Sequence, residues 1–151
     1  MMLGGWHSAA IAQCAPAPDS AYFFRNLAEL RAEAKLADNR AFYESLLSEH
    51  FVAHDQDGKA LPKREFIDGE LAADRAPDTD RYYAVRDFRL VEHRKGLAVA
   101  NYLLVENDRQ SWRREIYEVE DGRWRLASVD AGSPDSQLHA QSDAQTDVEA
   151  R

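Results

Sequence analysis

The sequence predicts an α+β domain in which N-terminal amphipathic helices pack on a strongly bent antiparallel sheet, forming a cone-shaped half-barrel. In the first half, apolar residues recur with the period of a helix. From Arg81 onward the period changes to two, and short turn pairs separate the apolar runs. Strands of about ten residues are long enough to coil, and only the helices can cover the concave face.

Three helices are expected before the sheet. Asp19 or Ser20 can cap the first helix, Asp38 can cap the second, and Pro62 fits the first turn of the third. The second helix should reach about Glu49, and a short strand follows it over residues 51–54. The expected apolar stripes are Phe23, Leu27, Leu30 and Ala34; Phe42, Leu46 and Leu47; and Phe66, Ile67 and Leu71.

Four long strands are expected in the second half. They cover residues 81–92, 97–106, 110–120 and 123–131, and three short turns join them into a meander. The turn pairs are Lys95-Gly96, Asn107-Asp108 and Asp121-Gly122. The last pair carries the strongest signal, because a type I′ hairpin needs two central residues with positive φ.

Composition indicates one domain and argues against several partners. The chain has 151 residues, of which 44% are hydrophobic, enough for a single core. A net charge of -8 argues against nucleic acid and anionic membranes, which require a positive field. No apolar run approaches the roughly 20 residues that span a bilayer. The single cysteine, Cys14, excludes an intrachain disulfide.

The chain ends differ in composition from its middle. Residues 1–18 form a disordered leader or a poorly formed signal peptide, because small apolar residues lack a basic segment before them. Residues 19–132 form the domain. Residues 133–151 are expected to be a disordered tail, because they offer almost no large apolar side chain. The expected location is the cytoplasm, or the periplasm if the leader is a signal peptide.

Three phrases resemble the nuclear transport factor 2-like superfamily, in particular its small bacterial SnoaL-like and uncharacterised members. They are residues 41–52, AFYESLLSEHFV; Asp57-Gly58 followed by residues 63–66, KREF; and residues 117–126, YEVEDGRWRL. The likeness covers about residues 19–132 and implies a cystatin-like fold. It does not imply one activity, since members include isomerases, dehydratases, epoxide hydrolases, polyketide cyclases, non-catalytic subunits and transport adaptors.

Asp130 is the first candidate for catalysis. If Trp124 points into the cone, as in relatives, period two puts Leu126, Ser128 and Asp130 on the same face. A carboxylate beneath an apolar roof has a raised pKa and can act as a general base, as in ketosteroid-isomerase-like members. The alternative is that Asp130 is solvated at the strand end, beside Gly132.

His54 is the second candidate, because its strand lines the pocket mouth in relatives and imidazole titrates near neutral pH. The alternative is a simply exposed histidine. No metal is expected, because His50 closes a helix while His54 lies on a strand. No cofactor is expected either, since no glycine-rich phosphate loop is present. Any enzyme of this kind would be a metal-free acid–base lyase or isomerase.

The expected ligand-binding residues are mainly aromatic and aliphatic. They are Phe42, Tyr43, Phe66, Arg86, Phe88, Asn101, Tyr117, Trp124 and Leu126. Such a lining favours a neutral or weakly anionic, largely apolar molecule. Arg86 either binds a ligand carboxylate or pairs with a residue such as Glu115, and pairing is the preferred reading because buried charges need partners.

Three function classes remain open. The first is a protein that binds a small apolar molecule without catalysis. The second is a cofactor-independent isomerase, dehydratase or cyclase of the SnoaL or ketosteroid-isomerase type, and the third is a non-catalytic interaction subunit. A homodimer is also predicted, because the outer sheet face should carry Val85, Val91 and one apolar set within residues 97–105.

Overall fold

A computed structural model describes residues 21–72 and 82–133. The predicted leader, the caps Asp19 and Ser20, and residues 134–151 of the predicted tail lie outside these ranges. The elements are α1 (Ala21–Leu36), α2 (Arg40–Leu46), β1 (Leu47–His54), β2 (Ala60–Pro62), α3 (Lys63–Ala72), β3 (Tyr83–Arg94), β4 (Leu97–Glu106), β5 (Arg109–Glu120) and β6 (Arg123–Gly132). Within the described ranges, no helix is long and apolar enough to cross a membrane.

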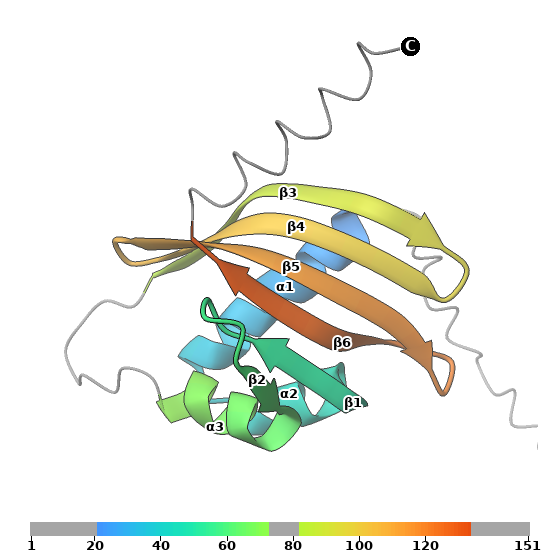
Figure 1. The fold of residues 1–151 in the computed structure, drawn as a ribbon, viewed down its shortest axis with the longest axis horizontal. Helices are drawn as coiled ribbons and strands as arrows, with labels where there is room; N and C mark the ends of the chain where they lie inside the picture. The colour runs from blue at the N-terminus through green and yellow to red at the C-terminus, as the bar shows by residue number, and fades with distance from the viewer. Residues whose placement is uncertain (1–20, 73–81, 134–151) are drawn as a thin grey trace, which may run out of the picture.

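The strands form one bent sheet in the order β2-β1-β6-β5-β4-β3. Figure 1 shows α1 crossing one face of this sheet, with α2 and α3 beside β1 and β2. The expected α+β half-barrel is confirmed, and the four long strands lie close to their predicted positions. Two pairings were not predicted. The strand β1 runs parallel to β6, and the short strand β2, which the sequence did not predict, pairs antiparallel with β1.

The Asp121-Gly122 turn has the backbone that its sequence predicts. Asp121 has φ 52° and Gly122 has φ 73°. Two consecutive positive φ angles are the signature of a type I′ turn, whose twist matches that of the flanking strands. This turn therefore fixes the register between β5 and β6.

A bulge in β3 reverses the inward and outward faces of that strand. Asp87 has φ 50°, and the register with β4 shifts between Arg86 and Arg89. Val85 is only 7% exposed and packs inward, while Arg86 is exposed. The predictions that Val85 lies on the outer face and that Arg86 shares an inner face with Phe88 are therefore wrong.

A second irregularity changes the faces of β6. Ile116 pairs with Ser128 and Tyr117 pairs with Leu126, so Ala127 is an extra residue between them. Leu126 and Val129 are consequently both buried in the core. The expectation that Asp130 shares the inward face of Leu126 is wrong, because the extra residue shifts the alternation by one.

The predicted stripe of α3, Phe66, Ile67 and Leu71, is buried as expected, but α1 and α2 differ from their predicted faces or ends. The buried stripe of α1 includes Phe24, Ala28, Arg31 and Lys35, one residue on from most of the predicted stripe. A one-residue step rotates a helix face by about 100°.

Asn39, rather than Asp38, caps α2: its side chain accepts a hydrogen bond of 3.1 Å from the Phe42 amide. The strand β1 begins at Leu47, so His50 lies on a strand instead of closing a helix. Pro62 ends β2 immediately before α3, rather than standing in the first turn of that helix.

Candidate functional site

Aromatic side chains fill the narrow end of the cone. The Phe24 ring lies 5.1 Å from the rings of Phe23, Tyr117 and Trp124, measured between centroids. Phe24 and Tyr117 are buried, and Leu126 belongs to the same core cluster. The predicted ligand residues Tyr117, Trp124 and Leu126 therefore pack against α1 or within the core.

The deepest polar group of the interior is Glu115. Its Oε1 forms an ion pair with Arg31 Nη2 at 2.6 Å and accepts a hydrogen bond of 2.7 Å from the Tyr102 hydroxyl. Arg31 Nη2 also donates a hydrogen bond of 2.6 Å to the Tyr102 oxygen. Its Oε2 accepts a hydrogen bond of 2.5 Å from the Tyr117 hydroxyl. The sequence analysis offered Arg86 as the partner of Glu115, but the partner is Arg31 of α1.

The surroundings of this network favour the charged form of Arg31 and the protonated forms of Tyr102 and Tyr117. Burial alone would lower the pKa of Arg31, but Glu115 and the neighbouring tyrosines together raise that pKa well above its usual value. Burial raises the pKa of Tyr102 and Tyr117. The tyrosines therefore remain hydrogen-bond donors and Arg31 remains charged, which suits a structural role better than proton transfer.

A second charged group lies at the open end of the cone. Lys35 Nζ is 2.6 Å from Glu106 and 3.7 Å from Glu70, and it lies 5.0 Å from the centroid of the Tyr83 ring. Burial opposes the charged form of Lys35, but Glu70 and Glu106 raise its pKa overall. The hydroxyl of Tyr43, another predicted ligand residue, contacts Glu70 at 3.4 Å. Through Glu70, these contacts join α1 and α2 to α3.

A cavity of about 250 Å³, which we call the α3 hollow, lies at this open end. Its apolar walls are Ala53, Leu61, Phe66, Val129 and Ala131. Five ionisable residues also line it: His54, Asp55, Glu65, Glu70 and Arg113. The α3 hollow thus combines an apolar surface with polar groups from α3, β1 and β5, the usual composition of a small-molecule site.

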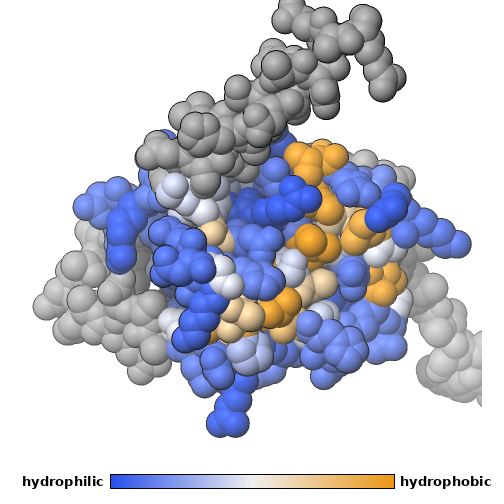
Figure 2. Space-filling model, viewed as in Figure 1, coloured by the Kyte–Doolittle hydropathy of each residue, from blue (hydrophilic) through white to orange (hydrophobic). Residues whose placement is uncertain are grey.

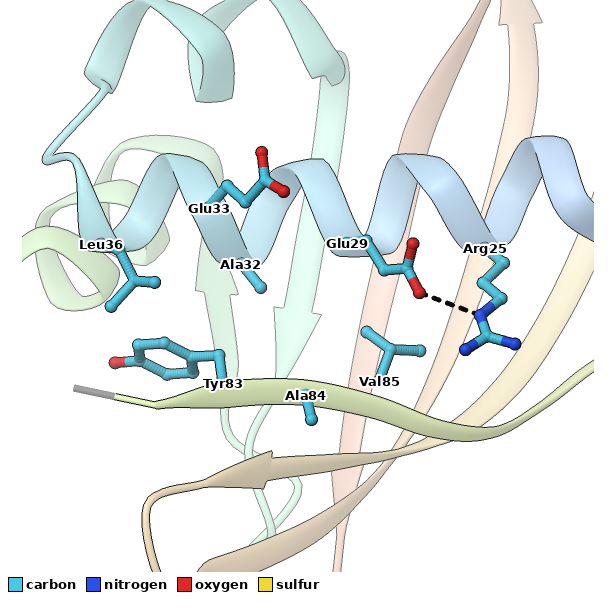
Figure 3. A pocket seen from close by; sticks show the side chains of 8 residues that line it. All are labelled: Arg25, Glu29, Ala32, Glu33, Leu36, Tyr83, Ala84 and Val85. Carbon is cyan, nitrogen blue, oxygen red and sulfur yellow. Dashed lines mark hydrogen bonds and ion pairs between the residues drawn. The ribbon is translucent and has the colours of Figure 1, made fainter. Parts of the chain in front are cut away.

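A second cavity, the α1 groove, lies between α1 and the edge strand β3 and measures about 330 Å³. Figure 3 shows Leu36 and Val85 pointing into the space between the two elements, with Arg25 and Glu29 joined beside it. That ion pair is 2.9 Å long and exposed to solvent. The surface of the α1 groove is more polar than that of the α3 hollow, so the α3 hollow is the better candidate site for an apolar ligand.

The structure brings the two predicted catalytic residues together. His54 and Asp130 are paired across β1 and β6, and His54 Nδ1 lies 2.7 Å from Asp130 Oδ1. An Nδ1–H that donates to this carboxylate leaves Nε2 of a neutral ring as an acceptor. Both side chains are partly exposed, at 41% and 44%, and His54 lines the α3 hollow.

Of the nine predicted ligand residues, Phe66 alone lines the α3 hollow. Phe42 and Phe88 are half-buried beside the core, and Arg86 is exposed. Asn101 is half-buried on β4, and its Oδ1 is buried without a hydrogen-bond partner among the described residues.

Sequence reasoning missed Glu65, Glu70 and Arg113. A signal for Arg113 was present, because period two on β5 places Arg113, Glu115 and Tyr117 on one face. Since Tyr117 was expected to point inward, Arg113 should have been expected there too.

Comparisons with known proteins found solved structures of similar fold. No family model matches the chain, and no curated protein matches it. A nuclear transport factor 2-like protein from Cytophaga hutchinsonii has a TM-score of 0.64 at 10% identity, covering 76% of this chain and 98% of that one. The association domain of CaMKII from C. elegans has a TM-score of 0.61 at 13% identity, covering 72% and 91%.

A third similar structure is a proposed ketosteroid isomerase from Shewanella frigidimarina. Its TM-score is 0.58 at 13% identity, and the match covers 77% of this chain and 98% of that one. At such low identities, the three likenesses establish a shared fold and carry no information on activity.

We predict that Arg31→Met lowers the free energy of unfolding by about 3–5 kcal/mol, because it leaves Glu115 buried without its cation. Adding Glu115→Gln should recover part of this loss, because the uncompensated charge is then removed. Urea denaturation of both variants measures the effect. Arg25→Met is the control and should cost less than about 1 kcal/mol, since its ion pair is exposed. Additive losses from the two core changes would contradict the coupling.

Proposed function

Because the chain has the fold of the nuclear transport factor 2-like proteins, we propose that it binds a small, largely apolar molecule in the α3 hollow. The observation that supports this is the apolar wall formed by Leu61, Phe66 and Val129 within a cavity of about 250 Å³. Drug-sized ligands occupy pockets of about 300–1,000 Å³, so the ligand should be smaller than a steroid. A single aromatic ring with a short substituent is of suitable size.

Highly charged metabolites are disfavoured in the α3 hollow. Glu65 and Glu70 lie on its helical wall. Among its lining residues, one arginine, Arg113, supplies a positive charge. Desolvating a phosphate dianion beside two carboxylates costs several kcal/mol, and one guanidinium does not compensate for it. The ligand is therefore neutral or carries at most one negative charge.

Filling the α3 hollow should abolish ligand binding without unfolding the protein. A Cβ at Gly69 would meet nothing within 4 Å, so Gly69→Leu can place a side chain at the hollow. Phenylacetamide should raise the Tm of the wild type by several degrees, because a ligand at 100 times its Kd adds about 2.7 kcal/mol. It should not raise the Tm of Gly69→Leu.

The matched control for this experiment is Arg64→Leu, an exposed position on the same helix. This variant should respond to phenylacetamide as the wild type does. An equal response from Gly69→Leu, or stabilisation of the wild type by phosphorylated compounds alone, would contradict the assignment of the α3 hollow.

A second candidate function is metal-free acid–base catalysis, and the 2.7 Å contact between His54 and Asp130 favours it. In this proposal Asp130 orients the ring, and His54 Nε2 removes a proton from a carbon beside a carbonyl group. Asp130 is then a positioning residue rather than the base. The overall reaction would be an isomerisation or an elimination that needs no cofactor.

Hydrogen–deuterium exchange tests this candidate. With phenylacetone in D₂O as the probe, the wild type should accelerate exchange at the carbon between ring and carbonyl, and His54→Gln should reduce the acceleration about 10²–10⁴-fold. Asp130→Asn should reduce it less, because the base itself remains in place. His50→Gln is the control, because His50 is an exposed residue of the same strand. An unchanged rate in His54→Gln would exclude this role.

We also propose that the chain forms a homodimer through the outer face of the sheet. Figure 2 shows hydrophobic side chains gathered over part of this face. Val91 is 50% exposed there, and Leu103 and Ile116 are half-exposed. An apolar sheet face of this kind is better covered than left in water. The same surface would serve a non-catalytic interaction subunit, and the CaMKII association domain is a structural neighbour.

Sedimentation equilibrium at micromolar concentration should give twice the chain mass of 17.1 kDa. Ile116→Lys should produce a monomer, because it places an uncompensated charge in the interface. Tyr22→Lys should remain dimeric, since Tyr22 is 74% exposed on α1, away from the outer sheet face. A monomeric wild type would refute the proposed dimer.

A further inference from the structure

We propose that Arg113 is a specificity-determining residue that selects ligands carrying one carboxylate, whose oxygens it binds inside the α3 hollow. The inference rests on the proposed function, because it requires a ligand in that hollow. It goes further by naming the chemical class: a small, apolar monocarboxylate.

The first observation is an unmade hydrogen bond. Arg113 lines the α3 hollow, and its Nε is buried with no hydrogen-bond partner among the described residues. Leaving a buried donor unsatisfied costs about 1–3 kcal/mol, and more when the group is charged. Because Nε is closed even to a water-sized group, a ligand carboxylate in the hollow would meet the Nη nitrogens of the same guanidinium.

The second observation is that two carboxylates, one on the same strand and one lining the hollow, have other partners. Glu115, two residues along the same strand, forms its ion pair with Arg31. Glu70, across the hollow on α3, lies close to Lys35 and the Tyr43 hydroxyl. Neither pairing includes Arg113, so its charge remains available to a ligand.

The third observation is the position of the guanidinium among apolar groups. Arg113 is paired with Ala131 across β5 and β6, and both residues line the hollow with Val129. An apolar ligand body can pack on Phe66 and Val129 while its carboxylate meets the guanidinium edge. Guanidinium and carboxylate are geometrically matched for two parallel hydrogen bonds, which an amide or alcohol cannot equal.

The competing possibility is an amine ligand, because Asp55, Glu65 and Glu70 also line the hollow. Asp55 Oδ1 already accepts hydrogen bonds from the amides of Asp57 and Lys59. Glu65 is exposed, so solvent screens its charge. Glu70 lies 3.7 Å from Lys35, which offsets part of its charge and is shared with Glu106. The carboxylates therefore offer an amine less than the unsatisfied guanidinium offers an anion.

Three probes of similar shape and different charge test the proposal: phenylacetate, phenylacetamide and 2-phenylethylamine, titrated into the full chain by calorimetry. Phenylacetate should bind at least about tenfold more tightly than phenylacetamide, which corresponds to about 1.4 kcal/mol. Arg113→Met should remove this preference while leaving phenylacetamide binding nearly unchanged. Arg113→Lys should retain only part of it, because an ammonium cannot form the paired hydrogen bonds.

The matched control is Arg114→Met, the next residue of the strand, which is exposed and should keep the preference. If Arg113→Met does not fold, judged by circular dichroism, the comparison of Arg113→Lys with wild type decides the question. Equal binding of phenylacetate and phenylacetamide would overturn the role of Arg113 and leave the hollow as the site. Tightest binding of 2-phenylethylamine would also overturn the role of Arg113 and leave the hollow as the site. If no probe binds, both the role of Arg113 and the proposed binding function are overturned.

Discussion

The buried ion pair between Arg31 and Glu115 determines how α1 lies on the sheet. Both charges have left water, so each requires the other and the two tyrosine hydroxyls that complete the network. Any other rotation of α1 would leave one charge buried alone, at a cost of several kcal/mol. The pair therefore directs Phe24 toward the narrow end of the cone and Lys35 toward the open end.

This orientation explains where chemistry can take place. With Phe24 packed on Tyr117 and Trp124, the narrow end is filled by protein and the tyrosine protons are fixed by burial. At the open end, α3 and the ends of β1, β5 and β6 meet less closely, and the α3 hollow lies between them. The aromatic residues thus form a rigid base that positions the polar groups of the open end.

The sequence was sufficient for the elements and insufficient for their faces. Period two and the Asp121-Gly122 turn placed the four long strands, because both signals are local. Single-residue bulges at Asp87 and Ala127 reversed the faces on which the predicted site depended, and alternation alone does not reveal them. His54 and Phe66 were found, but Arg113 was missed because charged residues within strands are usually exposed.

Long-range pairing is also why the buried charges escaped prediction. Arg31 and its network partner Tyr102 are separated by 71 residues, as are Lys35 and Glu106. Once these pairs form, Arg31 offsets Glu115 and Lys35 lies between two carboxylates, in a chain that carries -8 as a whole. That overall charge repels anions at long range, but salt screens it beyond about 10 Å. At contact, the low dielectric of a partly buried site strengthens nearby interactions, so the local guanidinium governs which ligand charge the hollow accepts.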